Sequence, residues 1–393
     1  MVVTIIVLII LAGISISLVI GNNGIMQKAV KGREDYTGAA INEQMSLNKI
    51  EDYIENESSE LISIEEAKQK GILTEKTSVI DTNGNIIRVP QGFKIAADSG
   101  LNVTEGIVIE DNDIKTGIGN NRGNQYVWVP VGNGIKKNDG TTVDITLGRY
   151  AFADGTNDKD TNGNVLAKGT STLKQDAVNY TQEVEISYDN KRYKELATSR
   201  VGVASNGTDG LNTTALNLKG FVDSVKANGG YYIARYEASY GTDGKANSKV
   251  SNSYSGSNVE GKLWNNITQI NAATVSRNLY TGVNSDLINS YAWDTAIVYI
   301  QNFSGDTDYS RQNSLNTSLA NTGVNNDEKC KINDMASNTM EWTTEYCTYT
   351  DSSHAYPCAS RGGSYSSYYT YGRAYYYAEF SYDHVSFRCA LYM

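Results

Sequence analysis

Tyrosines crowd the carboxyl-terminal end of this chain, and the crowding limits how that end can fold. Nine of the 28 tyrosines among the 393 residues lie within the last 33, and three of them are consecutive, at positions 375–377. Successive side chains of a β-strand point to opposite faces, so consecutive tyrosines cannot all enter one core. With 36 glycines beside them, the tyrosines favour a turn-rich structure with aromatic side chains at its surface.

Several function classes are excluded by the residue types that the chain lacks or scatters. Its two histidines, His354 and His384, are far apart in sequence, so no paired-histidine metal motif can be written, and no G-x-S-x-G hydrolase turn is present. The net charge is −10 and the basic residues are dispersed, which argues against a nucleic-acid partner. We therefore predict a protein that is not an enzyme and that binds no nucleic acid.

Residues 1–20 form an apolar run without a charged side chain. Twenty helical residues span about 30 Å, the thickness of a bilayer core, so the run predicts a membrane-spanning helix. VVTIIVLIILAGISISLVIGNNGIMQKA resembles the amino-terminal helix of type IV pilin-like proteins of Gram-positive bacteria, although that family's basic leader, processing glycine and glutamate do not precede it. The resemblance implies a membrane-anchored protein at the cell surface, with residues 1–57 as hydrophobic helix and stalk and other pilin subunits as partners. The positive-inside rule alone would place the following domain inside the cell, because basic residues follow the run.

Residues 58–123 are predicted to form an adaptor that follows the stalk. Ser63 and Glu66 have the spacing of a helix capping box, and Gly71 is placed to end that helix. The stretch DTNGNIIRVP then joins a turn to a β-rich run.

A polar insertion is predicted at about residues 136–215. Its stretch DKDTNG begins like an EF-hand calcium loop, but Gly169 occupies the twelfth position, where a glutamate is required. A polar hairpin turn is therefore expected instead of a calcium site. After the insertion, GGYYIARYEASY alternates as a strand, and LINSYAWDTAIVYIQNF has the apolar spacing of a buried helix with Trp293 and Tyr299 as packing residues and Asp294 as an interior polar residue.

Short motifs near the end of the chain indicate the fold more specifically. Together with YVWVPV, YYIARYEAS and SFRCAL, they resemble the formylglycine-generating-enzyme (sulfatase-modifying factor) type of the C-type lectin fold. The resemblance implies an α+β chain with a C-type-lectin-like domain over residues 124–393, behind the amino-terminal helix. The residues that carry it are Asn333, Asp334, Asn338, Glu341, Trp342, Arg361, Gly362 and Gly363.

The polar residues of these motifs allow two chemical interpretations. Asp334, Asn338 and Glu341 offer oxygens that could accept backbone hydrogen bonds or bind calcium, and hydrogen bonding is favoured. No cofactor is then required, with calcium at Asp334 and Asn338 as the alternative. Arg361 precedes two glycines, which indicates a sharply bent strand whose guanidinium pairs with a buried carboxylate, for which Glu341 is the candidate.

The resemblance does not extend to catalysis. The enzymes of that family use paired cysteines between the RGGS-like and FRC-like strands, whereas this chain has no cysteine between Gly363 and Phe387. Cys347 and Cys358 flank a ten-residue loop and could form a disulfide in an exported protein or stay free thiols. A catalytically inactive or divergent formylglycine-generating-type oxidase is one alternative function.

Where the cysteines are missing, Tyr and Ser alternate with framework residues over residues 364–388, which we call the terminal segment. Tyr gives a large contact area at low entropic cost, and Ser gives adaptable hydrogen bonds. The arrangement resembles the variable protein of a diversity-generating retroelement, in which adenine-directed mutagenesis rewrites a segment of a lectin-fold domain.

That resemblance implies a hypervariable surface that binds a protein or glycan on another cell or surface. The alternative from another class is a structural minor pilin without a diversified ligand site. The predicted contact residues are Tyr365, Ser366, Ser367, Tyr368, Tyr369, Tyr371, Tyr375, Tyr376, Tyr377, Phe380, Tyr382, Asp383, His384 and Ser386.

Overall fold

The structure is a computed structural model of the chain, and the residues that it describes belong to one unit, residues 61–393. The predicted membrane helix and stalk lie outside the described residues. Among the described residues, no helix is long and apolar enough to cross a bilayer. The structure describes residues 61–115, 119–197, 217–251, 259–313, 318–324, 326–366 and 368–393.

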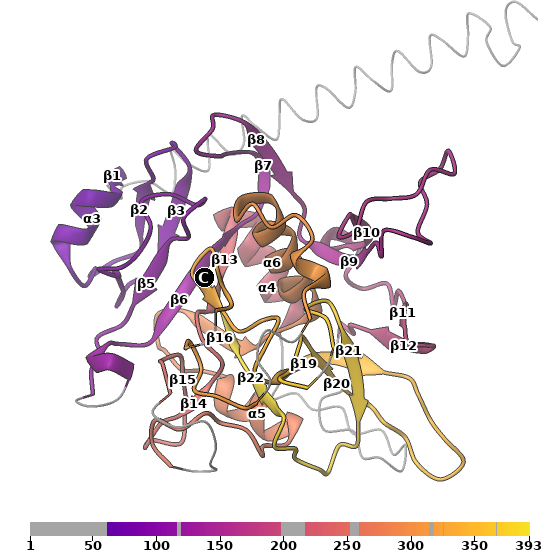
Figure 1. Cartoon of the computed structure of the whole chain (residues 1–393). Helices are drawn as coiled ribbons and strands as arrows, with labels where there is room; N and C mark the ends of the chain where they lie inside the picture. The colour runs from indigo at the N-terminus through magenta and orange to yellow at the C-terminus, as the bar shows by residue number, and fades with distance from the viewer. Residues whose placement is uncertain are drawn as a thin grey trace, which may run out of the picture. The chain divides into compact units, whose positions relative to one another are not determined.

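The described unit mixes helices with two larger sheets, which confirms the predicted α+β class (Figure 1). All strand pairs of the first sheet are antiparallel. Its central strands β6 (Gln125–Pro130) and β13 (Gly230–Ala234) hold the YVWVP and GYYIA runs, and every residue of both is buried. The order across this sheet is β16 (Asn284–Leu287), β23 (Cys389–Tyr392), β13 (Gly230–Ala234), β6 (Gln125–Pro130), β5 (Val108–Glu110) and β4 (Lys94–Ile95).

The second sheet contains the strands of the terminal segment, drawn in gold and yellow in Figure 1. Strand β22 (Val385–Phe387) leaves the sequential order and pairs in parallel with β19 (Met340–Cys347). After the bend at Gly362 and Gly363, the chain therefore adds two strands to this sheet, one of them β22. The order across the sheet is β11 (Ile186–Tyr188), β12 (Lys191–Lys194), β19 (Met340–Cys347), β20 (Cys358–Arg361) and β21 (Arg373–Tyr376).

Helix α6 (Ser290–Phe303) is the centre of the core and contacts β6 of the first sheet and β19 of the second. Asn289 caps it by accepting a hydrogen bond from the Ala292 N–H at 2.9 Å. Every residue of α6 except Asn302 is buried. The buried helix predicted at this position is confirmed, and its burial explains why the run is apolar on nearly all sides.

Smaller elements surround the two sheets. The capping box at Ser63 and Glu66 forms both of its hydrogen bonds, and Gly71 follows α3 with a φ of +70°, as predicted. The remaining elements are β1 (Leu61–Ser63), α3 (Ile64–Lys70), β2 (Thr77–Ile80), β3 (Ile86–Val89), η1 (Gly119–Asn121), β7 (Gly132–Lys136), β8 (Thr142–Ile145), β9 (Gly148–Phe152), β10 (Ser171–Asp176), η2 (Ala177–Asn179), α4 (Leu218–Asn228), β14 (Ser239–Tyr240), β15 (Ala246–Asn247), α5 (Gln269–Ser276), η3 (Tyr309–Arg311), β17 (Glu328–Lys329) and β18 (Ile332–Asn333).

The predicted adaptor and insertion are both built into the sheets. Strands β4 and β5 of the adaptor extend the first sheet beside β6, and β12 of the insertion pairs with β19 in the second. Arg149 and Tyr193 of the insertion are fully buried. The insertion is polar overall, yet a few of its side chains belong to the core, and its composition does not reveal them.

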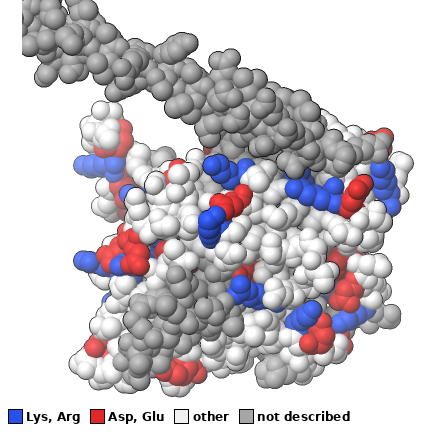
Figure 2. Space-filling view, turned by 180° about the vertical axis from the view of Figure 1, so that it is seen from behind, with Lys and Arg blue, Asp and Glu red and all other residues white. Residues whose placement is uncertain are grey.

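Charges of both signs are interspersed on the face of the molecule that Figure 2 shows. Figure 2 shows Lys and Arg lying next to Asp and Glu, with broad uncharged areas between them. In the acidic stretch that begins like an EF-hand, the carboxylate of Asp160 is engaged by the backbone of the same turn. Its Oδ1 accepts hydrogen bonds from the N–H groups of Asn162 and Asn164 at 2.8 Å each. The predicted polar hairpin turn is confirmed there.

Candidate functional site

The terminal segment begins at a bend that requires glycine. Gly362 has a φ of +92°, and a Cβ atom there would lie 3.0 Å from the Trp293 ring. At Gly363 a Cβ would lie 2.3 Å from the carbonyl oxygen of Ala336, closer than atoms can approach. Because only glycine fits both positions, the sharply bent strand predicted after Arg361 is confirmed.

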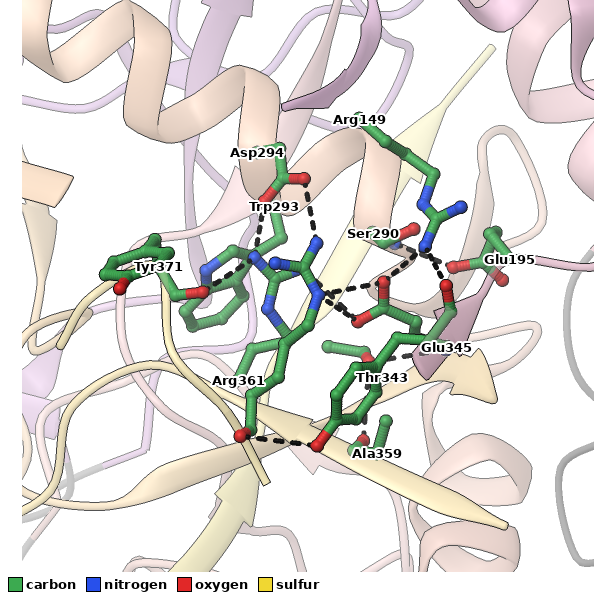
Figure 3. Close-up of polar contacts among 12 residues, drawn as sticks. Arg149, Glu195, Ser290, Trp293, Asp294, Thr343, Glu345, Ala359, Arg361 and Tyr371 are labelled. Carbon is green, nitrogen blue, oxygen red and sulfur yellow. Dashed lines mark hydrogen bonds and ion pairs between the residues drawn. The ribbon is translucent and has the colours of Figure 1, made fainter. Parts of the chain in front are cut away.

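Buried ion pairs hold both sides of this bend, and we call them the ion cluster (Figure 3). Arg361 forms an ion pair with Asp294 of α6, and its Nη1 lies 3.5 Å from Glu345 of β19. Arg373, at the start of β21, lies 3.0 Å from Glu345 and 3.2 Å from Asp294. Arg149 of β9 reaches Glu345 at 2.7 Å. All five side chains are buried, so the terminal segment is attached to the core by charges shielded from water.

The predicted partner of Arg361 was wrong. Glu341 lies opposite Arg361 in the β19–β20 register, but its two carboxylate oxygens bind Arg388 through Nε and Nη2. This two-pronged contact occupies both oxygens, and Arg361 pairs with Asp294 and Glu345 instead.

The carboxylates of the ion cluster and its surroundings have opposite pKa shifts. Burial alone would raise the pKa of Glu345, but the charges of Arg373, Arg361 and Arg149 outweigh burial and lower it to about 2. Burial raises the pKa of Glu195 to about 7, although the Ser290 N–H and the Thr344 hydroxyl donate to it. Glu345 therefore stays ionised, whereas Glu195 titrates near neutrality.

The raised pKa values of buried carboxyl groups predict that the folded chain loses stability as the pH rises toward neutrality. Glu195 and Asp327, both with a pKa raised to about 7 by burial, hold protons that the unfolded chain, with ordinary values of 4.5 and 3.8, releases earlier. The free energy of unfolding should thus fall between about pH 5 and pH 7.5. Urea midpoints measured across this range test the sign, and Glu195→Gln should flatten the decline. A midpoint that rises over this range would contradict the expectation.

The predicted calcium ligands are engaged in protein hydrogen bonds. Asp334 Oδ2 accepts from the Thr322 hydroxyl at 3.1 Å and from the Gly323 N–H at 2.6 Å. Asn338 donates to Glu237 at 2.5 Å and accepts from the Ala320 N–H at 2.9 Å. In the described part of the chain, no three His, Cys, Asp or Glu side chains are arranged to hold a metal ion. Calcium at Asp334 and Asn338 stays a prediction without support from this arrangement.

All four cysteines are buried free thiols, so the structure shows the free-thiol alternative for Cys347 and Cys358. Burial raises the pKa of Cys347 to about 11 and that of Cys389 to about 12. Burial also raises the pKa of Cys358. Buried thiols that stay protonated are poor nucleophiles.

One part of the terminal segment lines a cleft of about 520 Å³, which we call the tyrosine cleft. Tyr371 packs edge-on against Tyr188 with ring centroids 5.3 Å apart and lies nearly parallel to Tyr369 at 5.8 Å. The Arg311 guanidinium lies 4.2 Å from the Tyr371 ring centroid. The residues around this cleft include Phe152, Tyr188, Arg311, Tyr368, Tyr371 and Arg373.

A second group of rings joins β21 to the loop between β19 and β20, and we call it the loop cluster (Tyr349, Tyr356, Tyr375, Tyr377 and Phe380). Tyr375 contacts Tyr349 with ring centroids 4.8 Å apart, and Tyr377 contacts Tyr356 at 4.4 Å. Tyr188 packs on the same small apolar core as Tyr349 and Tyr375, so the loop cluster is connected to the tyrosine cleft. These rings therefore form a connected aromatic surface.

Tyr376 points to the opposite face of β21, as alternation along a strand requires. Its ring lies 5.3 Å from Trp342 and 4.4 Å from Tyr382. Its hydroxyl lies 3.0 Å from His384 Nε2, and His384 Nδ1 lies 3.0 Å from an Asp383 carboxylate oxygen. The predicted contact residues are therefore divided between two faces of the strand.

The exposure of the predicted contact residues varies widely. Ser386 is completely buried and shares a hydrogen bond with the Thr339 hydroxyl, so its predicted contact role was wrong. Ser367 lies outside the described residues. The exposed positions are Ser366, Tyr368, Tyr369, Phe380 and Asp383. The half-buried positions are Tyr365, Tyr371, Tyr375, Tyr376, Tyr377, Tyr382 and His384.

Several residues of this surface were missed by the sequence analysis. Tyr188 and Arg311 come from distant parts of the chain, and no local pattern identifies them. Tyr349 and Tyr356 did carry a signal, because their loop, TYTDSSHAYP, has the Tyr, Ser, Asp and His composition of the terminal segment.

Comparisons with known proteins find only distant similarity. No known family profile matches the chain, and no curated protein matches it. The P3c variant of the major tropism determinant is 14% identical with a TM-score of 0.28, over 84% of this chain and 98% of that chain. Treponema denticola variable protein 1 is 10% identical with a TM-score of 0.22, over 68% and 96%. CarF is 13% identical with a TM-score of 0.31, over 42% and 87%. Similarities this low assign neither fold nor function, so the proposals below rest on the geometry.

Proposed function

We propose that the chain is a surface-displayed binding protein and that its terminal segment, with the tyrosine cleft and the loop cluster, is the surface that contacts the ligand. The observation that carries the proposal is that the residues exposed for contact and the residues buried in the fold are different residues of this segment. Exposed or half-buried rings alternate with buried anchors such as Arg373, Val385 and Arg388. Such a surface can change its contact residues while the buried anchors keep the fold.

The rings are arranged to bind at low entropic cost. Tyr356 and Tyr377 share a hydrogen bond between their hydroxyls at 2.7 Å, and Tyr369 stacks on Tyr371. Rings already held by neighbours lose little freedom on binding, and aromatic side chains dominate binding energy at interfaces. The proposed partner is a protein or glycan on another cell or surface, and residues 1–20 are proposed to anchor the chain in the membrane.

Diversification by a retroelement is part of the same proposal. The exposed positions carry the residue types expected from rewritten adenine-containing codons, whereas Gly372 and Ala374, which lie between them, are packed tightly. Sequencing around the 3′ end of the gene tests this part. A near-identical template repeat beside a reverse transcriptase gene is the expected result, and the absence of both would remove diversification from the proposal.

A combined variant, Tyr368→Ser, Tyr369→Ser, Tyr377→Ser and Phe380→Ser, should lose at least 100-fold in affinity for a ligand found by screening the full chain against surface proteins and glycans. Each lost aromatic contact in a hot spot costs about 2 kcal/mol, and 1.4 kcal/mol is tenfold in affinity. The urea midpoint should change little, because these rings are exposed or half-buried.

The matched control replaces two exposed apolar residues outside the segment, Val178→Ser and Val324→Ser, which are 75% and 57% exposed. The control should bind like the unchanged chain. Equal binding by the combined variant would overturn the proposal and favour the structural minor pilin.

A further inference from the structure

The tyrosine cleft has two walls of different origin. Phe152 and Tyr188 belong to the part of the chain outside the terminal segment, whereas Tyr368 and Tyr371 belong to the segment itself. A volume of about 520 Å³ lies within the range typical of pockets for small molecules, roughly 300–1,000 Å³. A protein partner would instead bury roughly 800 Å² on each side, an area that extends well beyond a single cleft. The cleft thus suits a compact unit such as one or two rings.

Charges around the cleft are balanced. Asp158 and Asp189 face the same space as Arg311 and Arg373. Arg373 also pairs with Glu345 and Asp294 of the ion cluster, but these two carboxylates serve three guanidinium groups, so Arg373 still counts as a positive charge at the cleft. The Arg311 guanidinium donates to the carbonyl oxygens of Phe152 and Ala153 and lies 4.0 Å from Asp158. An ion entering the cleft would therefore gain little net attraction, which favours a neutral ligand.

The lining also mixes flat apolar surfaces with hydrogen-bonding groups of both kinds. The rings of Tyr188, Tyr368 and Tyr371 offer apolar contact area, carboxylates accept hydrogen bonds, and guanidinium groups donate them. A pyranose ring has matching chemistry, with apolar C–H faces and an edge of hydroxyls that both donate and accept.

From this balance of charge, ring surface and volume, we propose that the tyrosine cleft binds a neutral pyranose unit of a glycan. The proposal rests on the proposed function and names the ligand class of one part of that surface. Tyr188 and Arg311 supply the constant recognition of the sugar class. Replacements at Tyr368 and Tyr371 change which sugar is accepted.

The test measures binding of the full chain to an array of neutral glycans and to methyl pyranosides, with arginine amide and inorganic sulfate as charged probes. We expect binding of neutral glycans that is unchanged between 50 and 500 mM NaCl, since no ion pair is formed. Asp189→Asn, at an exposed turn position that asparagine tolerates, should weaken it about tenfold, and Tyr188→Ala should abolish it. Val178→Ser, at a residue that is 75% exposed and outside the proposed binding surface, is the control and should leave glycan binding unchanged.

Each other outcome has a distinct meaning. Binding of arginine amide or sulfate in place of neutral glycans, lost on Tyr188→Ala, overturns the sugar assignment. Retention of surface proteins alone, lost in the combined Tyr368, Tyr369, Tyr377 and Phe380 variant, overturns it as well but keeps the proposed function. Binding that none of these variants alters overturns both.

Discussion

Glu345→Gln should lower the free energy of unfolding by about 3–5 kcal/mol. Removing one partner of a buried ion pair leaves uncompensated charge in the core, and this carries a cost of that size. Glu345 lies within 3.5 Å of Arg149, Arg361 and Arg373, so its neutralisation leaves Arg361 and Arg373 with Asp294 and removes the carboxylate with which Arg149 pairs. Urea unfolding of the full chain measures the change through tryptophan fluorescence, because the Trp293 N–H donates to Thr370 O beside the ion cluster.

The matched control is Glu185→Gln, which removes the same charge from a pair at the surface. Glu185 lies 3.1 Å from Arg192, whose side chain is 66% exposed. An exposed ion pair contributes little, so the control should shift stability by less than about 0.5 kcal/mol. Equal effects of the two substitutions would show that the ion cluster does not hold the segment.

Trp342→Ala should lower the free energy of unfolding by a comparable amount, about 3–5 kcal/mol, because it empties a large fully buried site. The Trp342 N–H donates to Ile267 O at 2.8 Å, and its ring supports Tyr376 and Tyr382 from below. The same urea measurement should also show that the two tyrosines lose their fixed environment, visible as a change in near-ultraviolet circular dichroism.

Trp342→Phe separates the ring from its hydrogen bond. It keeps most of the apolar volume but leaves Ile267 O without its donor, which costs about 1–3 kcal/mol. We expect its unfolding free energy to lie between those of the unchanged chain and Trp342→Ala. If Trp342→Ala cost less than about 1 kcal/mol, the assignment of Trp342 to the core would be wrong.

Local patterns were sufficient to predict the elements whose causes are local. The capping box at Ser63, the helix that contains Trp293 and the bend at Gly362 each follow from neighbouring residues. The partner of Arg361 could not be predicted in this way, because Asp294 reaches it only through the packing of α6 against the second sheet. The sequence identified Asp294 as an interior polar residue but could not place it beside two arginines.

The proposed binding surface could be predicted only in part, because here too local patterns do not show which distant residues pack together. The composition of the terminal segment identified its tyrosines, since exposure follows from consecutive rings on a strand. It did not identify Tyr188, which meets Tyr371 only after β11 and β12 have joined the edge of the second sheet. It also assigned Ser386 to the surface, although β22 pairs in parallel with β19 and buries that residue.

Arg361 and Arg373 bind the same two carboxylates, Asp294 and Glu345. Both ends of the segment that connects β20 and β21 are thus fixed near one point in space, and this does not depend on which residues lie between them. The entropy of closing such a loop grows only slowly with its length, by about 0.6 kcal/mol for each doubling. Residues inserted beside Ser366 or Tyr368 should therefore lengthen the exposed turn at little cost in folding, so that variation in length is open to this protein as well as variation in side chain.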